Sequence, residues 1–130
     1  MYLDSSAVVA ILLDEPEAHQ LLSRLYAAGR TEISVVNKVE AALSIGRIIK
    51  DYSLAGRLVA EFLDKVGAKI SAVAPESYDD VLQAYTRYGK GTGHPAKLNF
   101  GDCFSYAFAK RSGVPLLYKG EDFSQTDLAG

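Results

Sequence analysis

The stretch YLDSSAVVAILL, residues 2–13, joins a short apolar run that ends in an acid to a second apolar run of helical character. Ser5 and Ser6 are residue types that favour the N-cap of a helix, so residues 7–13 are predicted to form a short helix. A strand that passes into a helix is the repeating unit of α/β proteins. This stretch therefore predicts a strand followed by a helix, with Asp4 where the strand ends.

The rest of the chain continues the same alternation. Three further strands are predicted over residues 31–35, 69–73 and 115–118, where apolar and β-branched residues gather. Helical spacing of apolar residues predicts helices over residues 16–29, 36–50, 53–66 (capped by Ser53), 75–85 and 99–113. Strands separated by helices predict one three-layer α/β/α domain over residues 1–130, with a mainly parallel central sheet.

Composition narrows the class of protein. Of 130 residues, 48% are hydrophobic and 23% are charged, which is typical of a globular domain and argues against disorder. No apolar run approaches the roughly 20 residues of a membrane-spanning helix, and the residues after Met1 show no secretory signal. Cys103 is the only cysteine, so the chain cannot form an internal disulfide. We therefore expect a cytoplasmic protein with no membrane partner.

Several acidic residues are predicted to lie at one edge of the sheet, near the carboxyl ends of its strands. Asp4 ends the first strand, and Glu121 and Asp122 follow the last strand. Asp102 lies in the opening turn of the helix that leads into that last strand. Ligands of open parallel sheets bind outside the carboxyl ends of the strands. These acids are therefore candidates for one shared cleft.

Glu40 is predicted to lie on the apolar stripe of its helix. Val36 precedes it by four residues and Leu43 follows it by three, which are same-face spacings. A carboxylate on such a stripe loses hydration unless a partner compensates for it. Either a metal ion or a basic side chain would serve, and a purely structural alternative is a glutamate that reaches water at the edge of the stripe.

Several clustered acids favour a divalent cation. Like charges a few ångströms apart repel, and one of them would normally take up a proton. Mg²⁺ or Mn²⁺ removes this conflict because both ions prefer carboxylate and water oxygens. In phosphodiester hydrolysis such an ion activates a bound water and neutralises the phosphate. A catalytic histidine or cysteine is then unnecessary, and we expect His19 on the surface and Cys103 in the core.

Each of the other acids also has a structural interpretation. Asp4 and Asp102 would each stabilise the N-terminus of the helix beside them, because anions are favoured there. Asp122 would be a turn residue in the sequence Gly120-Glu121-Asp122. Their convergence on one predicted edge is what favours a shared site.

Four segments together carry a family resemblance. Residues 2–7 (YLDSSA), Glu40, residues 99–107 (NFGDCFSYA) and residues 116–123 (LLYKGEDF) resemble PIN domains in their order and separation. They resemble more closely the VapC toxins of type II toxin–antitoxin systems. The resemblance extends over essentially the whole chain.

The resemblance implies roles for particular residues. Asp4, Glu40 and Asp102 match the metal-binding acids of the family, with Ser6 and Asn99 as supporting polar residues. Many relatives have their fourth acid at the place occupied here by a glycine.

The fourth role in this chain therefore passes to Asp122, with Glu121 or Asp127 as substitutes. The resemblance also implies endonucleolytic cleavage of RNA with Mg²⁺ or Mn²⁺. The expected partners are a second copy in a homodimer and a VapB-like antitoxin, in a heterotetramer or a larger complex. In such complexes the antitoxin inserts a basic or aromatic side chain into the acidic pocket.

Positive charge gathers locally although the formal net charge is −2. Residues 87–98 contain three glycines and a proline and predict a loop. Arg87, Lys90 and Lys97 in this loop are candidates for binding RNA phosphates. Stacking of bases on Tyr85, Tyr88 and Tyr106 is a further possibility, although tyrosines at helical spacing are more often core or interface residues.

Two other functions compete with the nuclease. A haloacid-type phosphatase or a receiver domain also places an aspartate after its first strand, but the phosphatase needs a second aspartate where this chain has Ser6. Residues 73–75 (VAP) offer no acid for a receiver, and Lys119 is the only supporting feature. The second competitor is a catalytically silent PIN-like module that binds protein or nucleic acid.

Overall fold

Four short parallel strands form the centre of the molecule in the computed structural model, which describes residues 1–128. The strands are β1 (Tyr2–Leu3), β2 (Glu32–Ser34), β3 (Lys69–Ser71) and β4 (Leu116–Leu117), in the order β3-β2-β1-β4. Tyr2 pairs with Glu32 on one side and with Leu116 on the other. The predicted parallel sheet is confirmed, with β1 and β2 at its centre.

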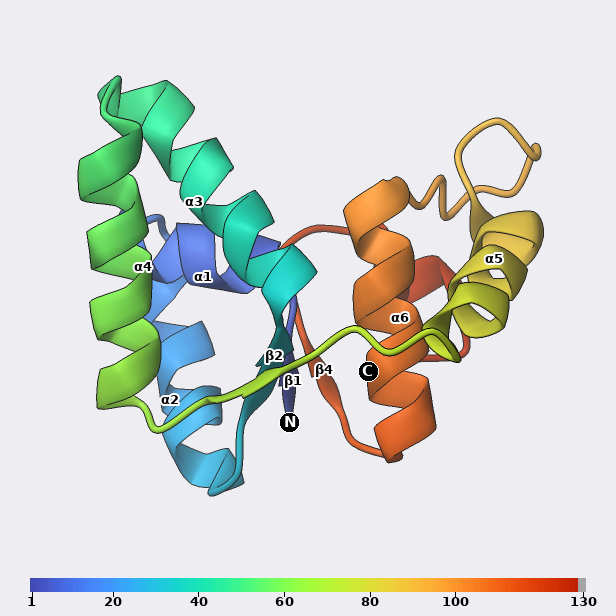
Figure 1. Ribbon diagram of the computed structural model, residues 1–130, viewed down its shortest axis with the longest axis horizontal. Helices are drawn as coiled ribbons and strands as arrows, with labels where there is room; N and C mark the ends of the chain where they lie inside the picture. The colour runs from blue at the N-terminus through green and yellow to red at the C-terminus, as the bar shows by residue number, and fades with distance from the viewer. Residues whose placement is uncertain (129–130) are drawn as a thin grey trace.

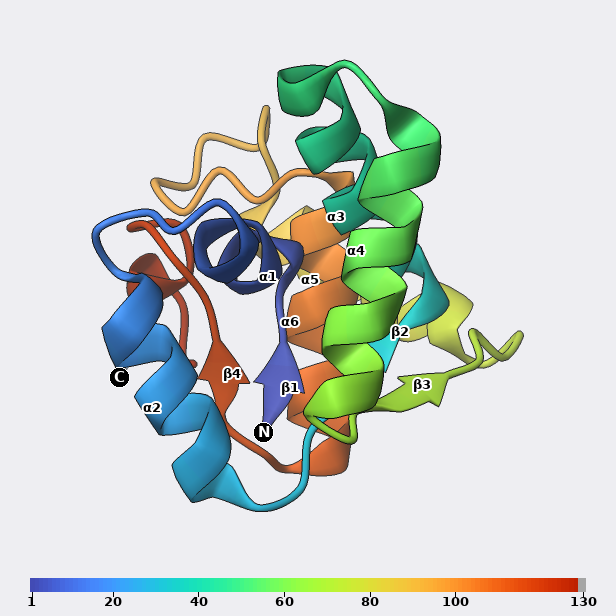
Figure 2. The ribbon, with the colours of Figure 1, turned by 90° about the vertical axis from the view of Figure 1, so that its left-hand side faces the viewer.

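Helices cover both faces of this sheet (Figures 1 and 2). Four of them lie on one face: α1 (Ser5–Leu12), α2 (Ala18–Ala28), α3 (Val35–Ile49) and α4 (Tyr52–Lys65). The opposite face is covered by α5 (Ser77–Tyr88) and α6 (Phe100–Ser112), and a short 3-10 turn, η1 (Phe123–Gln125), follows β4. The α/β/α architecture is therefore as predicted.

Alternation along the strands divides the core into two clusters. Leu3, Ile33 and Leu117 pack with the helices α1 to α4, and each is at most 1% exposed. Tyr2 and Leu116 point to the other face and pack with α5 and α6. Successive side chains of a strand face opposite sides of a sheet, so even strands of two or three residues contribute to both clusters.

Most helix ends differ from the prediction by one to three residues, and two of these differences have a clear physical reason. Asp51, rather than Ser53, caps α4, because its Oδ1 accepts a hydrogen bond from the backbone N–H of Leu54 at 2.9 Å. Both are residue types that cap helices well, and the sequence pattern does not choose between them. The helix α5 continues to Tyr88, three residues beyond the predicted end, because Tyr88 is anchored in the core.

The glycine-rich loop is closed by a bridge between Gly89 and Leu98. The N–H of Lys90 donates to the carbonyl of Leu98 at 2.8 Å, and the N–H of Leu98 donates to the carbonyl of Tyr88 at 2.9 Å. Leu98 itself is fully buried. This closure fixes the start of α6, where Asn99 and Asp102 lie. Within residues 1–128, none of the helices has the length and apolar character needed to cross a bilayer.

Candidate active site

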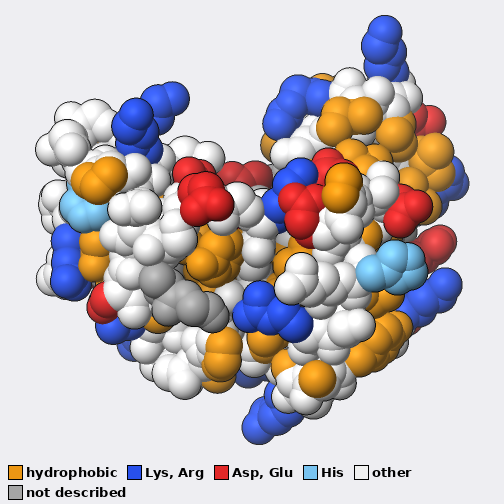
Figure 3. All heavy atoms as spheres, turned by 180° about the vertical axis from the view of Figure 1, so that it is seen from behind, with side chains coloured by type: hydrophobic (Ala, Val, Ile, Leu, Met, Phe, Trp, Pro, Cys, Tyr) orange, Lys and Arg blue, Asp and Glu red, His pale blue; other side chains and the backbone are white. Residues whose placement is uncertain are grey.

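A pocket of about 370 Å³ lies where the chain leaves the carboxyl ends of β1 and β4. From the side opposite to Figure 1, acidic side chains gather around a hollow with basic side chains beside them (Figure 3). Polar and charged residues from separate segments dominate the lining, which consists of Asp4, Ser5, Ser6, Val9, Glu15, Glu40, Ser44, Arg47, Asn99, Asp102, Lys119 and Asp122. The tertiary structure thus brings together all four acids that the sequence singled out.

Asp4 is the most deeply buried acid of the pocket, at 1% exposure. Its Oδ2 accepts a hydrogen bond from the N–H of Ser6 at 2.9 Å, which caps α1, and its Oδ1 accepts one from the hydroxyl of Ser105 at 2.5 Å. Burial raises the pKa of this carboxyl above its usual value, and the hydrogen bonds oppose the rise. One carboxylate therefore serves both as helix cap and as pocket acid.

Glu40 lies in α3 with its carboxylate against two other elements. Its Oε1 accepts hydrogen bonds from the hydroxyl of Ser5 at 2.5 Å and from Nδ2 of Asn37 at 3.4 Å. The fully buried Asn37 also donates to the carbonyl of Gly101 at 3.1 Å, so it ties α3 to the start of α6. Burial and the nearby charge of Asp4 raise the pKa of Glu40.

The predicted apolar stripe around Glu40 is wrong in detail. Leu43 is 45% exposed, and the buried residues of α3 are Asn37, Ala41 and Ile45, with the adjoining Gly46. The buried stripe of α3 is narrow and combines the large Ile45 with small and polar residues. Glu40 borders that stripe and faces the pocket, so its partial burial was correctly predicted, as was that of Val36, whereas the burial of Leu43 was not.

Asp102 and Asn99 form a reciprocal cap at the start of α6. Asn99 Oδ1 accepts from the N–H of Asp102 at 2.9 Å, and Asp102 Oδ2 accepts from the N–H of Asn99 at 3.0 Å. The pKa of Asp102 rises to about 7, mainly through burial and then through the charge of Asp4, with smaller contributions from Asp122 and Glu40. The charges of the other three acids therefore act on the carboxyl of Asp102.

Gly101 allows α6 to approach α3 this closely. A Cβ atom at position 101 would overlap the carboxylate of Glu40. The absence of a side chain is thus what lets Glu40 lie beside the turn that carries Asp102. The glycine was part of the motif in the sequence, but its reason is visible only in the packing.

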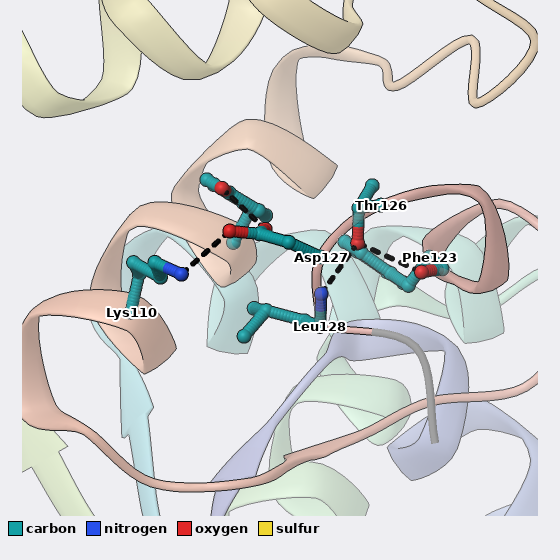
Figure 4. Close-up of polar contacts among 6 residues, drawn as sticks. Lys110, Phe123, Thr126, Asp127 and Leu128 are labelled. Carbon is teal, nitrogen blue, oxygen red and sulfur yellow. Dashed lines mark hydrogen bonds and ion pairs between the residues drawn. The ribbon is translucent and has the colours of Figure 1, made fainter.

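Of the three candidates for the fourth acid, Asp122 is the one that lines the pocket. Glu121 is exposed and takes a hydrogen bond from the hydroxyl of Ser124 at 3.3 Å. Asp127 lies away from the pocket, beside the middle and last turns of α6, where it accepts from the Tyr106 hydroxyl at 2.6 Å and pairs with Lys110 at 2.5 Å (Figure 4). The structure therefore favours Asp122 over both substitutes.

The basic residues at the pocket differ from those that the sequence suggested. None of Arg87, Lys90 and Lys97 belongs to its lining, whereas Arg47 and Lys119 do. Arg87 instead lies over the ring of Tyr88, with its guanidinium carbon 4.8 Å from the ring centre. A signal for Arg47 existed in the sequence, because it follows Glu40 by seven residues, two helical turns along the same face.

Several other predictions concern single side chains. Tyr88 and Tyr106 are 4% and 7% exposed and pack in the core, so the core interpretation of these tyrosines is confirmed and base stacking on them is not supported. Cys103 is buried as predicted, and His19 is exposed as predicted. Sequence reasoning missed Asn37 and Ser105, because a buried amide or hydroxyl leaves no pattern that separates it from a surface one.

The carboxylates of the pocket are spaced apart and do not converge on one common position. Within residues 1–128, no three acidic, histidine or cysteine side chains stand close enough together to enclose a metal ion. What the pocket offers is a set of hard oxygen donors on separate elements, each held by its own hydrogen bonds.

Comparison with known proteins agrees with this geometry. The chain matches the family model of the PIN domain over residues 1–128. Ribonuclease VapC42 of Mycobacterium tuberculosis is 41% identical over 128 residues, which are 98% of this chain and 96% of that protein. The chain is a PIN-domain protein of the VapC ribonuclease family. A VapC ribonuclease of Rhizobium meliloti is 45% identical over 139 residues, and the match covers 98% of this chain and 98% of that protein.

A solved VapC structure shares the fold. The crystal structure of Mycobacterium tuberculosis VapC20, described as a toxin that cleaves the sarcin-ricin loop, superposes with a TM-score of 0.70. The match covers 95% of this chain and 92% of VapC20 at 18% identity. Membership of the VapC family identifies this chain as a toxin-type endoribonuclease, and it excludes the phosphatase and receiver alternatives.

Proposed function

We propose that the acidic pocket is the active site of this VapC ribonuclease, and that Asp4, Glu40, Asp102 and Asp122 hold Mg²⁺ or Mn²⁺ there. The observation that carries the proposal is that these four acids, from separate segments of the chain, line one pocket. Burial and the neighbouring carboxylates raise the pKa of Asp102 to about 7, so near neutral pH the pocket holds more negative charge than it can stabilise alone.

The chemistry of the donors suits a hard divalent cation, which would draw the carboxylates closer together than they lie here. All four acids present carboxylate oxygens, and Ser6 and Asn99 add neutral oxygen atoms at the same pocket. Oδ2 of Asp102 accepts the Asn99 N–H, which leaves Oδ1 as the atom available to the pocket. Burial is the main cause of the raised pKa of Asp102, and a bound cation would relieve the repulsion that adds to it. Binding the ion and charging the acids would therefore support each other.

The residues around the acids would keep them in place during the reaction. Such an ion supplies charge neutralisation at the phosphate and activation of water. Ser105 fixes one oxygen of Asp4, and Ser5 and Asn37 fix one oxygen of Glu40. Fixed oxygens cost little reorganisation when charge develops on the substrate, which is the condition for electrostatic catalysis.

Cleavage of total bacterial RNA by the purified protein tests this proposal. We expect cleavage with added Mn²⁺ or Mg²⁺ that stops with EDTA, and a loss of at least about 100-fold in Asp4→Asn. Asp64→Asn is the matched control, because Asp64 is an exposed acid of α4 outside the pocket. Both proteins must show the same far-ultraviolet circular dichroism.

Two results would favour the silent binding module instead. One is equal cleavage by wild type and Asp4→Asn, which would point to a contaminating nuclease. The other is no cleavage by either protein with Mn²⁺ present. Cleavage that survives EDTA would contradict the metal.

The family also implies protein partners. We propose that a VapB-like antitoxin silences the enzyme and that the chain forms homodimers, assembled with the antitoxin as a heterotetramer or larger. An apolar groove between α5 and α6 supports the dimer, because its lining, which includes Tyr78, Leu82 and Phe100, contains no charged residue. Two copies of such a surface meet across a two-fold axis without opposing like charges.

Light scattering after gel filtration tests the oligomeric state. We expect a dimer for the wild type and a monomer for Leu82→Glu, because this change places two like charges in the shared surface. Lys65→Glu on α4 is the control for the added charge. A wild-type monomer at micromolar concentration would contradict the dimer and leave the active-site proposal unaffected.

A further inference from the structure

Two basic side chains border the acidic pocket from different elements. Arg47 lies in α3, and its guanidinium donates to the hydroxyl of Ser44 at 3.3 Å. Lys119 follows β4, and its backbone N–H donates to the hydroxyl of Ser6 at 3.0 Å. Both residues line the same pocket as the four acids.

Fold stability alone does not explain Arg47. Within residues 1–128 it forms no ion pair, and it is exposed. It nevertheless lines the same pocket as Glu40, which lies two helical turns earlier on α3. An unpaired guanidinium at the rim of an acidic pocket is available to an anion that enters the pocket.

Lys119 is charged and held at the pocket by two acids. Its Nζ lies 2.5 Å from a carboxylate oxygen of Glu15 and 3.7 Å from one of Glu17. These acids raise the pKa of Lys119, so it keeps its proton. About a third of its side chain remains exposed, so a phosphate can compete with the two carboxylates for the ammonium group.

We propose that Arg47 and Lys119 bind RNA phosphates on two sides of the scissile bond, so that the RNA strand crosses the pocket between α3 and the segment after β4. This inference rests on the proposed function of the pocket. The guanidinium of Arg47 suits two-pronged binding of a phosphate, and the ammonium of Lys119 acts as a point charge. Glu15 holds Lys119 in place and competes with the RNA for it.

A structural role for Lys119 predicts a different outcome. If its ion pair with Glu15 only fastened two loops together, removal of either partner would have the same effect. If Lys119 binds RNA, removal of Lys119 weakens binding, whereas removal of Glu15 releases the ammonium and strengthens binding. The two interpretations therefore differ in the sign of the Glu15 effect.

Steady-state kinetics separate these cases. Cleavage of total bacterial RNA by the wild-type protein with Mn²⁺ first yields a labelled RNA fragment that contains a mapped cleavage site. On this fragment we expect Arg47→Gln and Lys119→Gln each to raise KM about tenfold, with kcat changed less than threefold. The slope of log kcat/KM against log salt concentration should fall by about 0.7 in magnitude for each variant.

Three further variants complete the test. Lys119→Arg should retain a KM within about twofold of wild type, because it keeps the charge. Glu15→Gln should lower KM about two- to fivefold, whereas Glu61→Gln, which removes an exposed acid of α4 outside the pocket, should not. Arg24→Gln on α2 and Lys65→Gln on α4 are the controls for loss of a positive charge.

The outcomes are distinguishable from failure of the proposed function. If the wild-type protein cleaves no RNA with Mn²⁺, the proposed function is overturned together with this inference. If the wild type cleaves but KM is unchanged in Arg47→Gln and Lys119→Gln, the phosphate sites alone are overturned. If Glu15→Gln raises KM as Lys119→Gln does, Lys119 has only a structural role.

Discussion

Asp102 and Asp127 lie at different ends of α6 and in opposite electrical surroundings, because Asp102 is in the first turn whereas Asp127 pairs with Lys110 in the last. Asp102 faces three other acids, and its pKa rises to about 7. Asp127 accepts hydrogen bonds from Lys110 and Tyr106, and these two donors hold its pKa below the usual value. The surroundings thus disfavour the charged form of the aspartate at position 102 and favour it at position 127.

The difference separates an acid that stabilises the fold from one that costs stability. A structural carboxylate carries its own cation, as Asp127 does in Lys110. A pocket whose acids outnumber its cations is retained against repulsion, and perturbed acids of this kind gather at functional sites. The surroundings of each acid therefore give a better indication of its role than its position near a strand end.

The largest expected difference between the two residues is in catalysis. Asp102→Asn should lower the rate of RNA cleavage by at least about 100-fold with Mn²⁺, whereas Asp127→Asn should leave it within about twofold. Asp102→Ala should likewise abolish growth arrest on expression in a bacterial host while the fold persists. Continued arrest by a folded Asp102→Ala protein would count against the site.

The pH dependence of stability is the next largest effect. Because folding raises the pKa of Asp102 from 3.8 to about 7, the folded state binds more protons than the unfolded state between these values. The free energy of unfolding without divalent ions should therefore fall as the pH rises from about 4 to 8, by at most roughly 4 kcal/mol from this group. Urea unfolding at several pH values with EDTA measures it. Asp102→Asn should flatten this dependence, and an unchanged slope in that variant would show that Asp102 is not the group responsible.

Added metal should reverse that loss. Mn²⁺ or Mg²⁺ should raise the melting temperature by several degrees at pH 8 and by less at pH 5, since protonated acids bind cations poorly. The rise in melting temperature caused by the metal should be lost in Asp4→Asn and kept in Asp64→Asn if the ion binds in the pocket rather than acting as a general salt. Equal shifts in these two variants would contradict a metal held by the pocket.

The smallest effect belongs to the structural acid. Asp127→Asn should lower the free energy of unfolding by about 1 kcal/mol at pH 7, because its partner Lys110 is half exposed and only the Tyr106 hydrogen bond is partly buried. Folding lowers the pKa of Asp127, so this contribution exists above the usual pKa and disappears as the pH falls through the lowered one. The stability contributed by Asp127 should therefore grow as the pH rises, whereas the contribution of Asp102 should shrink. The same sign for both residues would contradict this difference between the two acids.

Local patterns in the sequence were sufficient for the architecture and for the principal acids. Period-two and helical spacings predicted all four strands and the helices between them, with errors of a few residues at ends such as Ser53 and Tyr88. Asp4, Asp102 and Asp122 were found because parallel strands and their helices bring the ends of distant segments to one edge. Glu40 was found from a stripe of which one member was wrongly assigned, since Val36 is half-buried but Leu43 is exposed.

The sequence by itself determined the α/β/α fold, the family resemblance and the acids that line one pocket, because these depend on local periodicity and on residue types at fixed separations. Only the tertiary structure decided that Asp122 rather than Asp127 faces the pocket, that Arg47 and Lys119 border it, and that Asn37 and Ser105 hold its acids. The physical reason is that hydrogen bonds and ion pairs form between side chains up to about a hundred positions apart, as between Asp4 and Ser105. Their formation depends on how helices pack across the sheet, which no local pattern encodes.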